Sequence, residues 1–146
     1  MKQLFALLKT ALMALLVASS LQVHAADGDA IKTVYHMSEG IPQASRGLNN
    51  IRNHLSADPK AKIVVVAHGL GIDFLLQGAS NQMEQPFAGA IADLANKGVE
   101  FRVCNNTLVS RKIDADKIVL EAKIVPSGVS EVARLQAREG FVYLKP

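Results

Sequence analysis

The chain has 146 residues, 49% of them hydrophobic, with a formal net charge of +3 and a single cysteine. This length suits one compact domain, and one cysteine excludes an intramolecular disulfide, so the fold must rest on packing alone. Because basic residues neither cluster nor interleave with aromatic ones, nucleic acid is not expected as a partner.

The first 25 residues are typical of a secretory signal peptide. Lys2 and Lys9 precede an apolar stretch over residues 11–17, and the small-residue sequence Val-His-Ala ends at Ala25. That stretch is shorter than the roughly 20 residues needed to span a bilayer. We therefore expect cleavage near Ala25, a single domain over residues 26–146, a periplasmic location, and no membrane contact after cleavage.

Strand and helix patterns alternate along the first half of the expected domain. Residues 31–37 are typical of a strand. A helix follows from Pro42, because proline suits the first turn of a helix and an apolar stripe at helical spacing comes next: Ala44, Leu48, Ile51 and Leu55. Residues 61–69 form a near-continuous apolar run, as in a strand buried on both faces of a parallel sheet. Residues 69–82 are ambiguous and fit a short helix followed by a polar loop.

The alternation continues to the C-terminus. Pro86 begins a helix that ends at Gly98, a residue suited to a left-handed cap. We then expect a strand over 99–104, a short helix over 107–112, and a strand over 121–128 that Pro126 stops. A helix follows that is capped by Ser127, ends at Gly140 and carries Val129, Val132 and Leu135. The last expected element is a strand over 141–146. This order predicts an α/β fold in which helices cover both faces of a parallel sheet.

Three reactive side chains fall at the ends of the first three expected strands: His36, His68 and Cys104. Ligands of such sheets gather outside the carboxyl ends of the strands, so these side chains share one edge if the strands are neighbours. A thiol ahead of a helix, with Arg102 on the same strand face, is expected to have a lowered pKa and to favour the thiolate. The alternative is that Cys104 is an inert, buried hydrophobe.

The residues around Cys104 admit more than one role. Backbone N–H groups of Asn105, Asn106 and Thr107 are suited to hold an anionic sulfur species, although Asn106 and Thr107 also suit the cap of the following helix. His36 and His68 bind substrate in one hypothesis. In another they join Cys104 in a Cys/His/His set for zinc or copper. A further alternative is a non-catalytic ligand-binding or assembly module. Thioredoxin-like chemistry is disfavoured because it needs a second, resolving cysteine.

Five segments of the chain resemble the DsrE/DsrF-like sulfur-relay family: "HMSEG", "GLNNIRNHL", "KIVVVAHGLGIDFLL", "LANKGVEFRVCNNTL" and "KIVPSGVSEVARLQAREGFVYLKP". The resemblance runs from about Ile31 to Pro146. It implies a three-layer α/β/α sandwich with a five-stranded parallel sheet, and assembly into trimers or hexamers.

The resemblance also bears on chemistry. By motif position Cys104 matches the cysteine that carries sulfur as a persulfide in sulfur-transferring members. The best-understood members are cytosolic and receive sulfur from a partner protein, whereas an exported chain needs another donor, such as thiosulfate, polysulfide or a partner thiol. The resulting hypothesis is a periplasmic sulfurtransferase-like carrier without a cofactor. In it Cys104 reacts, and Asn105, Asn106, Thr107, His36, His68 and Arg102 bind the sulfur species.

Overall fold

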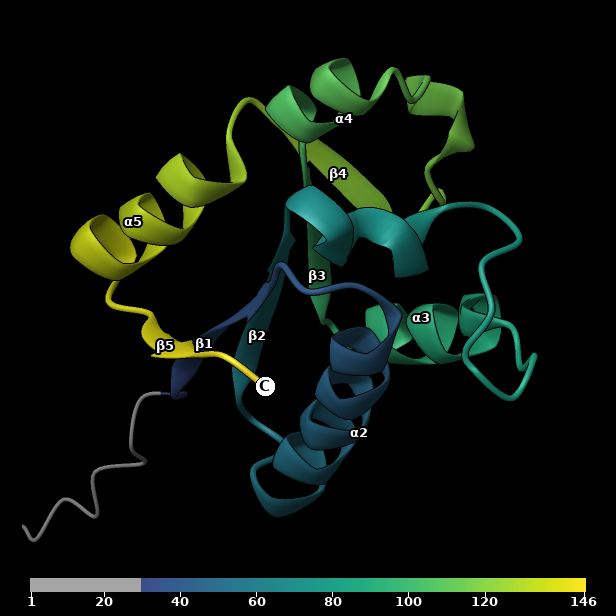
Figure 1. Cartoon of the computed structure of the whole chain (residues 1–146). Coiled ribbons are helices and arrows are strands. Elements are labelled where there is room, and N and C mark those ends of the chain that lie inside the picture. Colours follow the sequence, from purple (N-terminus) through teal and green to yellow (C-terminus); the bar gives the residue numbers. More distant parts are fainter. Residues whose placement is uncertain (1–29) are drawn as a thin grey trace, which may run out of the picture.

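A parallel five-stranded sheet organises residues 30–146, which are the residues that this computed structural model describes (Figure 1). The predicted signal peptide lies outside them. The strand order is β4-β3-β2-β1-β5. The strands are β1 (Lys32–Met37), β2 (Lys62–Ala67), β3 (Glu100–Cys104), β4 (Ala122–Val125) and β5 (Val142–Leu144). The helices are α2 (Ile41–Ala57), η1 (Gly69–Leu75), α3 (Phe87–Asn96), α4 (Asn105–Arg111), η2 (Ala115–Lys117) and α5 (Gly128–Glu139).

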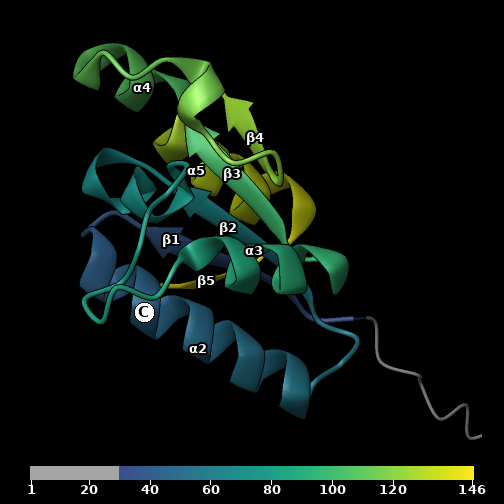
Figure 2. The same ribbon diagram turned by 90° about the vertical axis from the view of Figure 1, so that its right-hand side faces the viewer.

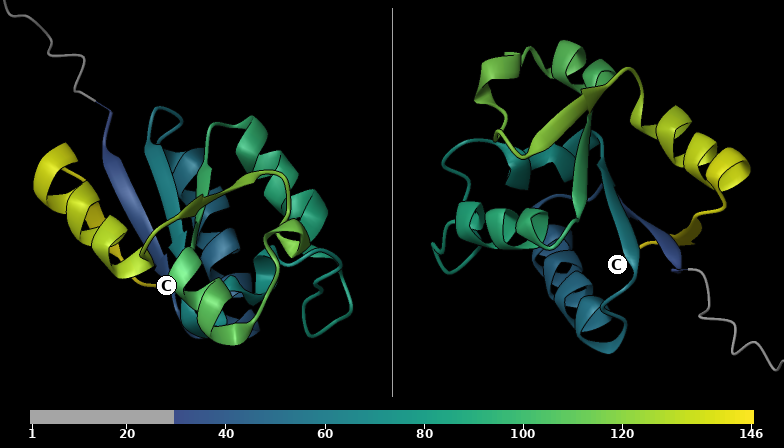
Figure 3. Two further views of the ribbon diagram at one scale, coloured as in Figure 1. Left: turned by 90° about the horizontal axis from the view of Figure 1, so that it is seen from above. Right: turned by 180° about the vertical axis from the view of Figure 1, so that it is seen from behind.

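Helices cover both faces of the sheet, as Figures 2 and 3 show. The larger core lies where α2, η1 and α3 pack on one face, and alternate strand residues such as Val65, Phe101 and Val103 point into it. Among residues 30–146, α5 is the helix that packs on the opposite face, through Val132 and Leu135. This arrangement confirms the predicted α/β/α sandwich. None of the helices in the described part of the chain is long and apolar enough to span a bilayer.

The predicted helix ends are largely confirmed. Pro42 lies in the first turn of α2, and Gly98 and Gly140 adopt positive φ angles of 88° and 72° after α3 and α5. The side chain of Ser127 caps α5 by accepting the N–H of Ser130 at 3.4 Å. The ambiguous segment after β2 begins with the short helix η1.

One detail of the expected helices was wrong. The helix α4 begins at Asn105, two residues before the prediction, because Cys104 both ends β3 and occupies the N-cap position. All three apolar residues that the sequence placed on α5 lie in it, where Val132 and Leu135 contact the strands and Val129 is 63% exposed.

Candidate functional site

The strand order brings His36, His68 and Cys104 to one edge of the sheet. The strands β1, β2 and β3 are adjacent. Ala67 on β2 pairs with Val103 on β3, and His68 and Cys104 are the residues that directly follow these two. His36 pairs with Val66, two residues before His68. Since side chains alternate between faces, all three belong to the face on which α5 packs.

The N-terminus of α5 lies between the two strand ends. A Cβ on Gly128 would be 3.1 Å from the Cβ atoms of both Cys104 and His68, and 3.5 Å from the carbonyl oxygen of Ala67. The Cβ atoms of Cys104 and His68 are therefore no more than twice that distance apart. Glycine begins this helix because the approach leaves almost no room for a side chain.

Several donors surround the thiol of Cys104, whose side chain is buried with a relative exposure of 4%. Cys104 is the N-cap residue of α4, and its side chain makes no capping hydrogen bond. Burial raises the pKa of the Cys104 thiol, but hydrogen bonds to the thiolate lower it by more. The groups that lower this pKa are the backbone N–H groups of Gly128, Thr107 and Asn106 and the Thr107 hydroxyl, and the Asn106 N–H also donates to the carbonyl of Pro126 at 3.3 Å. The net pKa of Cys104 lies below the ordinary value, as the sequence predicted, so the thiolate fraction is larger than that of an ordinary cysteine.

The Thr107 hydroxyl is oriented by η1. Its oxygen accepts the backbone N–H of Gly69 at 2.9 Å, and Thr107 is buried. With the oxygen occupied as an acceptor, the hydroxyl proton is available to the sulfur of Cys104. The expectation that Thr107 or Asn106 caps α4 through its side chain was wrong, because α4 has no side-chain cap hydrogen bond. Asn105 and Asn106, the first two residues of α4, are exposed.

A chain of three side chains runs from the edge strand β5 to the site. The Tyr143 hydroxyl lies 2.7 Å from Nδ1 of His36, and Nε2 of His36 lies 2.6 Å from Nε2 of His68. Burial lowers the pKa of His68. Burial also lowers the pKa of His36, and the charges of His68 and Lys145 act in the same direction. Both imidazoles are therefore neutral at neutral pH.

The histidine pair does not complete a metal site with the thiol. Within residues 30–146 no group of three or more histidine, cysteine or acidic side chains is arranged to hold a metal ion. The Nε2 atoms of His36 and His68 are occupied with each other. The Cys/His/His set considered from the sequence is therefore not formed by this arrangement.

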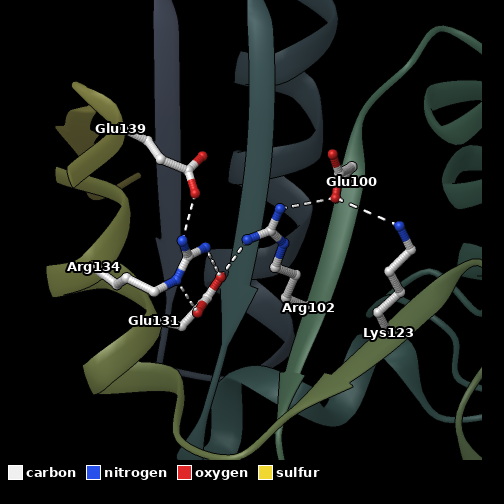
Figure 4. A network of polar contacts seen from close by, with 6 residues as sticks. All are labelled: Glu100, Arg102, Lys123, Glu131, Arg134 and Glu139. Atoms are coloured by element: carbon white, nitrogen blue, oxygen red, sulfur yellow. Dashed lines mark hydrogen bonds and ion pairs between the residues drawn. The ribbon is translucent and has the colours of Figure 1, made fainter.

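Arg102 lies on the expected face of β3 but contacts carboxylates instead of the thiol (Figure 4). Its guanidinium donates to Glu131 on α5 and, at 2.9 Å, to Glu100 on its own strand. Burial and the four hydrogen bonds are the largest causes that set the pKa of Cys104. The ion pairs of Arg102 are to Glu131 and Glu100, so its guanidinium does not pair with the thiol directly.

Two residues of the site were missed by the sequence interpretation, namely Gly128 and Tyr143. Because Ser127 was predicted to cap a helix, the position of Gly128 at the start of that helix could be predicted. Its proximity to Cys104 could not, since it depends on how α5 packs against the ends of the strands. Tyr143 belongs to the site because β5 pairs with β1, with Tyr143 opposite Val34. Alternation within β5 alone does not reveal that neighbour.

Comparisons with known proteins agree with this architecture. A model of the DsrE/DsrF-like family matches residues 8–146 of the chain. The protein of unknown function MTH1491 from Methanobacterium thermoautotrophicum is 27% identical with a TM-score of 0.70, and the match covers 80% of this chain and 99% of that one. The ychN protein from E. coli is 12% identical with a TM-score of 0.64, over 82% and 100% of the two chains, and is alike in fold alone. A search of the curated proteins found no match.

Proposed function

The chain belongs to the DsrE/DsrF-like family, which indicates a role related to sulfur relay, and from this premise we propose that it is a sulfur carrier that forms a persulfide on Cys104. The observation that carries the proposal is the position of Cys104 at the N-cap of α4, with the N-terminus of α5 against it at Gly128. A thiolate is the nucleophile in sulfur transfer, and the N–H groups at the two helix starts favour it by lowering the pKa of Cys104.

Loading and delivery need only one cysteine. The Cys104 thiol first loses its proton to solvent, and the thiolate attacks the outer sulfur of a donor such as thiosulfate. A new bond forms between Sγ and that sulfur, the S–S bond of thiosulfate breaks, and its electron pair leaves with sulfite. In delivery an acceptor thiolate attacks the outer sulfur of the persulfide, and Cys104 departs as a thiolate. No oxidant or cofactor is required.

The histidine pair is suited to contact the sulfur species beside Cys104. A neutral imidazole donates from one nitrogen and accepts at the other. With the Tyr143 hydroxyl donating to His36, His36 donates to Nε2 of His68, which leaves the proton of His68 on Nδ1. None of the described residues bonds to that nitrogen. His68, whose Cβ lies like that of Cys104 against Gly128, then offers an N–H donor to a terminal sulfur or to a leaving sulfite oxygen.

We further propose that the protein works in the periplasm as a homo-oligomer, either a trimer or a hexamer. The N-terminal signal-peptide pattern supports export. Export separates the protein from cytosolic donors, so the sulfur source is a small inorganic species or a partner-protein thiol. Because Cys104 is largely buried, a sterically small sulfur donor with an accessible terminal sulfur is favoured.

Intact-mass spectrometry tests the proposal. The protein, incubated with thiosulfate or polysulfide, should gain about 32 Da for one sulfur atom, and reductant should remove it. The variant Cys104→Ser should gain nothing. Wild-type protein that stays unmodified with both donors would overturn the persulfide role.

Histidine variants separate this role from metal binding. His36→Ala and His68→Ala should still load sulfur, more slowly, because the thiolate makes the attack and the imidazoles only assist. Elemental analysis is the control. Stoichiometric zinc or copper that is lost in both histidine variants and in Cys104→Ser would instead favour a metal-binding protein.

A further inference from the structure

The helix α5 is attached to the sheet by few apolar contacts. Its buried apolar side chains are Val132 and Leu135, which pack on Val34, Val64 and Val66 of the strands. The opposite face of the sheet carries a much larger core. Polar contacts therefore have a larger share in deciding where α5 lies over the strand ends.

Lys32 on β1 donates to the carbonyl of Glu139 at the C-terminal end of α5 at 3.1 Å, and an ion-pair network supplies the polar side-chain contacts nearer the N-terminal end. Figure 4 shows it running from α5 across β3 to β4, through Glu139, Arg134, Glu131, Arg102, Glu100 and Lys123. The only link in this network between α5 and the sheet is the pair formed by Arg102 and Glu131, whose side chains are 15% and 12% exposed. Both charges are largely removed from water, so their geometry is better defined than that of surface pairs.

Glu131 is held in place within the helix. Its two carboxylate oxygens accept from Arg134 at 2.8 and 3.0 Å, and its backbone N–H donates to the carbonyl of Ser127 at 3.0 Å. Glu131 lies in the first turn, three residues after Gly128. A restraint on this carboxylate therefore restrains the end of α5 whose N–H faces the thiol.

We propose that the ion pair between Arg102 and Glu131 is a positioning device, which holds the N-terminus of α5 against Cys104 so that the N–H of Gly128 meets the sulfur. The inference rests on the proposed function of Cys104. It assigns to Arg102 an indirect role: the guanidinium acts on the thiol through Glu131 and α5, and does not bind the sulfur species itself.

Charge and position act in opposite directions when Glu131 is changed. Removal of a negative charge near the thiol would by itself favour the thiolate and lower the pKa of Cys104. Loss of the ion pair between Arg102 and Glu131 moves the N–H of Gly128 away from the sulfur and raises the pKa of Cys104. The sign of the change in Glu131→Met therefore distinguishes the two effects. Glu100→Met is the matched control, because Glu100 contacts the same guanidinium but does not connect it to α5.

The experiment is a titration of the thiolate by its ultraviolet absorbance. The chain has one cysteine and two tyrosines, so subtraction of the same titration of Cys104→Ser leaves the signal of Cys104. In Glu131→Met we expect a pKa higher by about half a unit, which is about a threefold loss of thiolate below the pKa. Glu100→Met should leave the pKa unchanged or slightly lower. If circular dichroism shows that Glu131→Met does not fold, Glu131→Gln should give a smaller rise.

A pKa in the folded Glu131 variants that equals or falls below that of the wild type would overturn the positioning role. So would an equal rise in Glu100→Met. The titration uses no sulfur donor, so it is independent of persulfide loading. If no sulfur is loaded and the pKa of Cys104 still rises in Glu131→Met, the positioning role is supported and the proposed function is overturned. If sulfur is loaded and the pKa does not rise, the proposed function is supported and the positioning role is overturned.

Discussion

Replacement of Gly128 by alanine should weaken the activation of Cys104. The added Cβ would lie 3.1 Å from the Cβ atoms of Cys104 and His68. Both of these atoms are attached directly to backbone at the end of a strand, so neither moves away by a side-chain rotation. The helix α5 must therefore shift outward by a few tenths of an ångström, and the N–H of Gly128 shifts with it.

Two contributions decide the effect on stability. Alanine is favoured over glycine in a helix by about 1 kcal/mol, and an extra methyl group in a tightly packed place costs about 1–3 kcal/mol. We expect Gly128→Ala to lower the free energy of unfolding by about 1 kcal/mol. A helix N-terminus stabilises a nearby anion by about 0.3–1 kcal/mol, and one pKa unit corresponds to about 1.4 kcal/mol. Withdrawal of the N–H should thus raise the pKa of Cys104 by about half a unit.

Thiolate absorbance against pH and urea denaturation measure the two effects. Gly89→Ala is the matched control, because Gly89 lies within α3 and a Cβ there meets nothing within 4 Å. That variant should gain up to about 1 kcal/mol in stability without a change at the thiol. A Gly128→Ala protein with an unchanged or lower thiol pKa would refute the reasoning that α5 activates Cys104.

Three further predictions address the donors, the ion pairs and the assembly. Thr107→Val, which keeps the shape but removes the hydroxyl, should raise the pKa of Cys104 and slow its alkylation at neutral pH; an unchanged alkylation rate would exclude the hydroxyl as a donor. Hydrogen bonds from arginine lower the pKa values of Glu100 and Glu131 below the ordinary 4.5, so the stability that they contribute is complete above about pH 4.5 and is lost as the pH falls through the lower folded-state values. Urea denaturation between neutral pH and acid should show this loss, and a smaller one in Glu131→Met. Light scattering at micromolar concentration should show a trimer or hexamer, and a monomer alone would contradict the proposed assembly.

The sequence predicted well those features that depend on local pattern. The apolar runs located the buried strands, and Pro42, Gly98, Ser127 and Gly140 marked helix ends because each suits one backbone conformation. The placement of His36, His68 and Cys104 at strand ends followed from the same pattern. Their proximity required only that β1, β2 and β3 be neighbours, which is the strand order found.

The features that the sequence did not predict depend on docking between distant elements. Strand alternation put Arg102 on the correct face, but its partner Glu131 lies 29 residues further along, and an arginine beside a cysteine invites a direct pairing. The role of Gly128 depends on the position of α5 over the strand ends. Tyr143 reaches His36 only because β5 pairs with β1, and a three-residue strand with exposed side chains carries little pattern.

The donors at Cys104 differ from the usual means of activating a thiol. An imidazolium or a lysine beside a cysteine stabilises the thiolate only while it is charged, so such activation changes with pH. Here His36 and His68 have lowered pKa values and the Arg102 charge is taken up by carboxylates. Backbone N–H groups and one hydroxyl remain, and none of these titrates in the neutral range. The reactivity of Cys104 should consequently follow the ionisation of the thiol itself, and it depends on how the N-termini of α4 and α5 are placed around the sulfur.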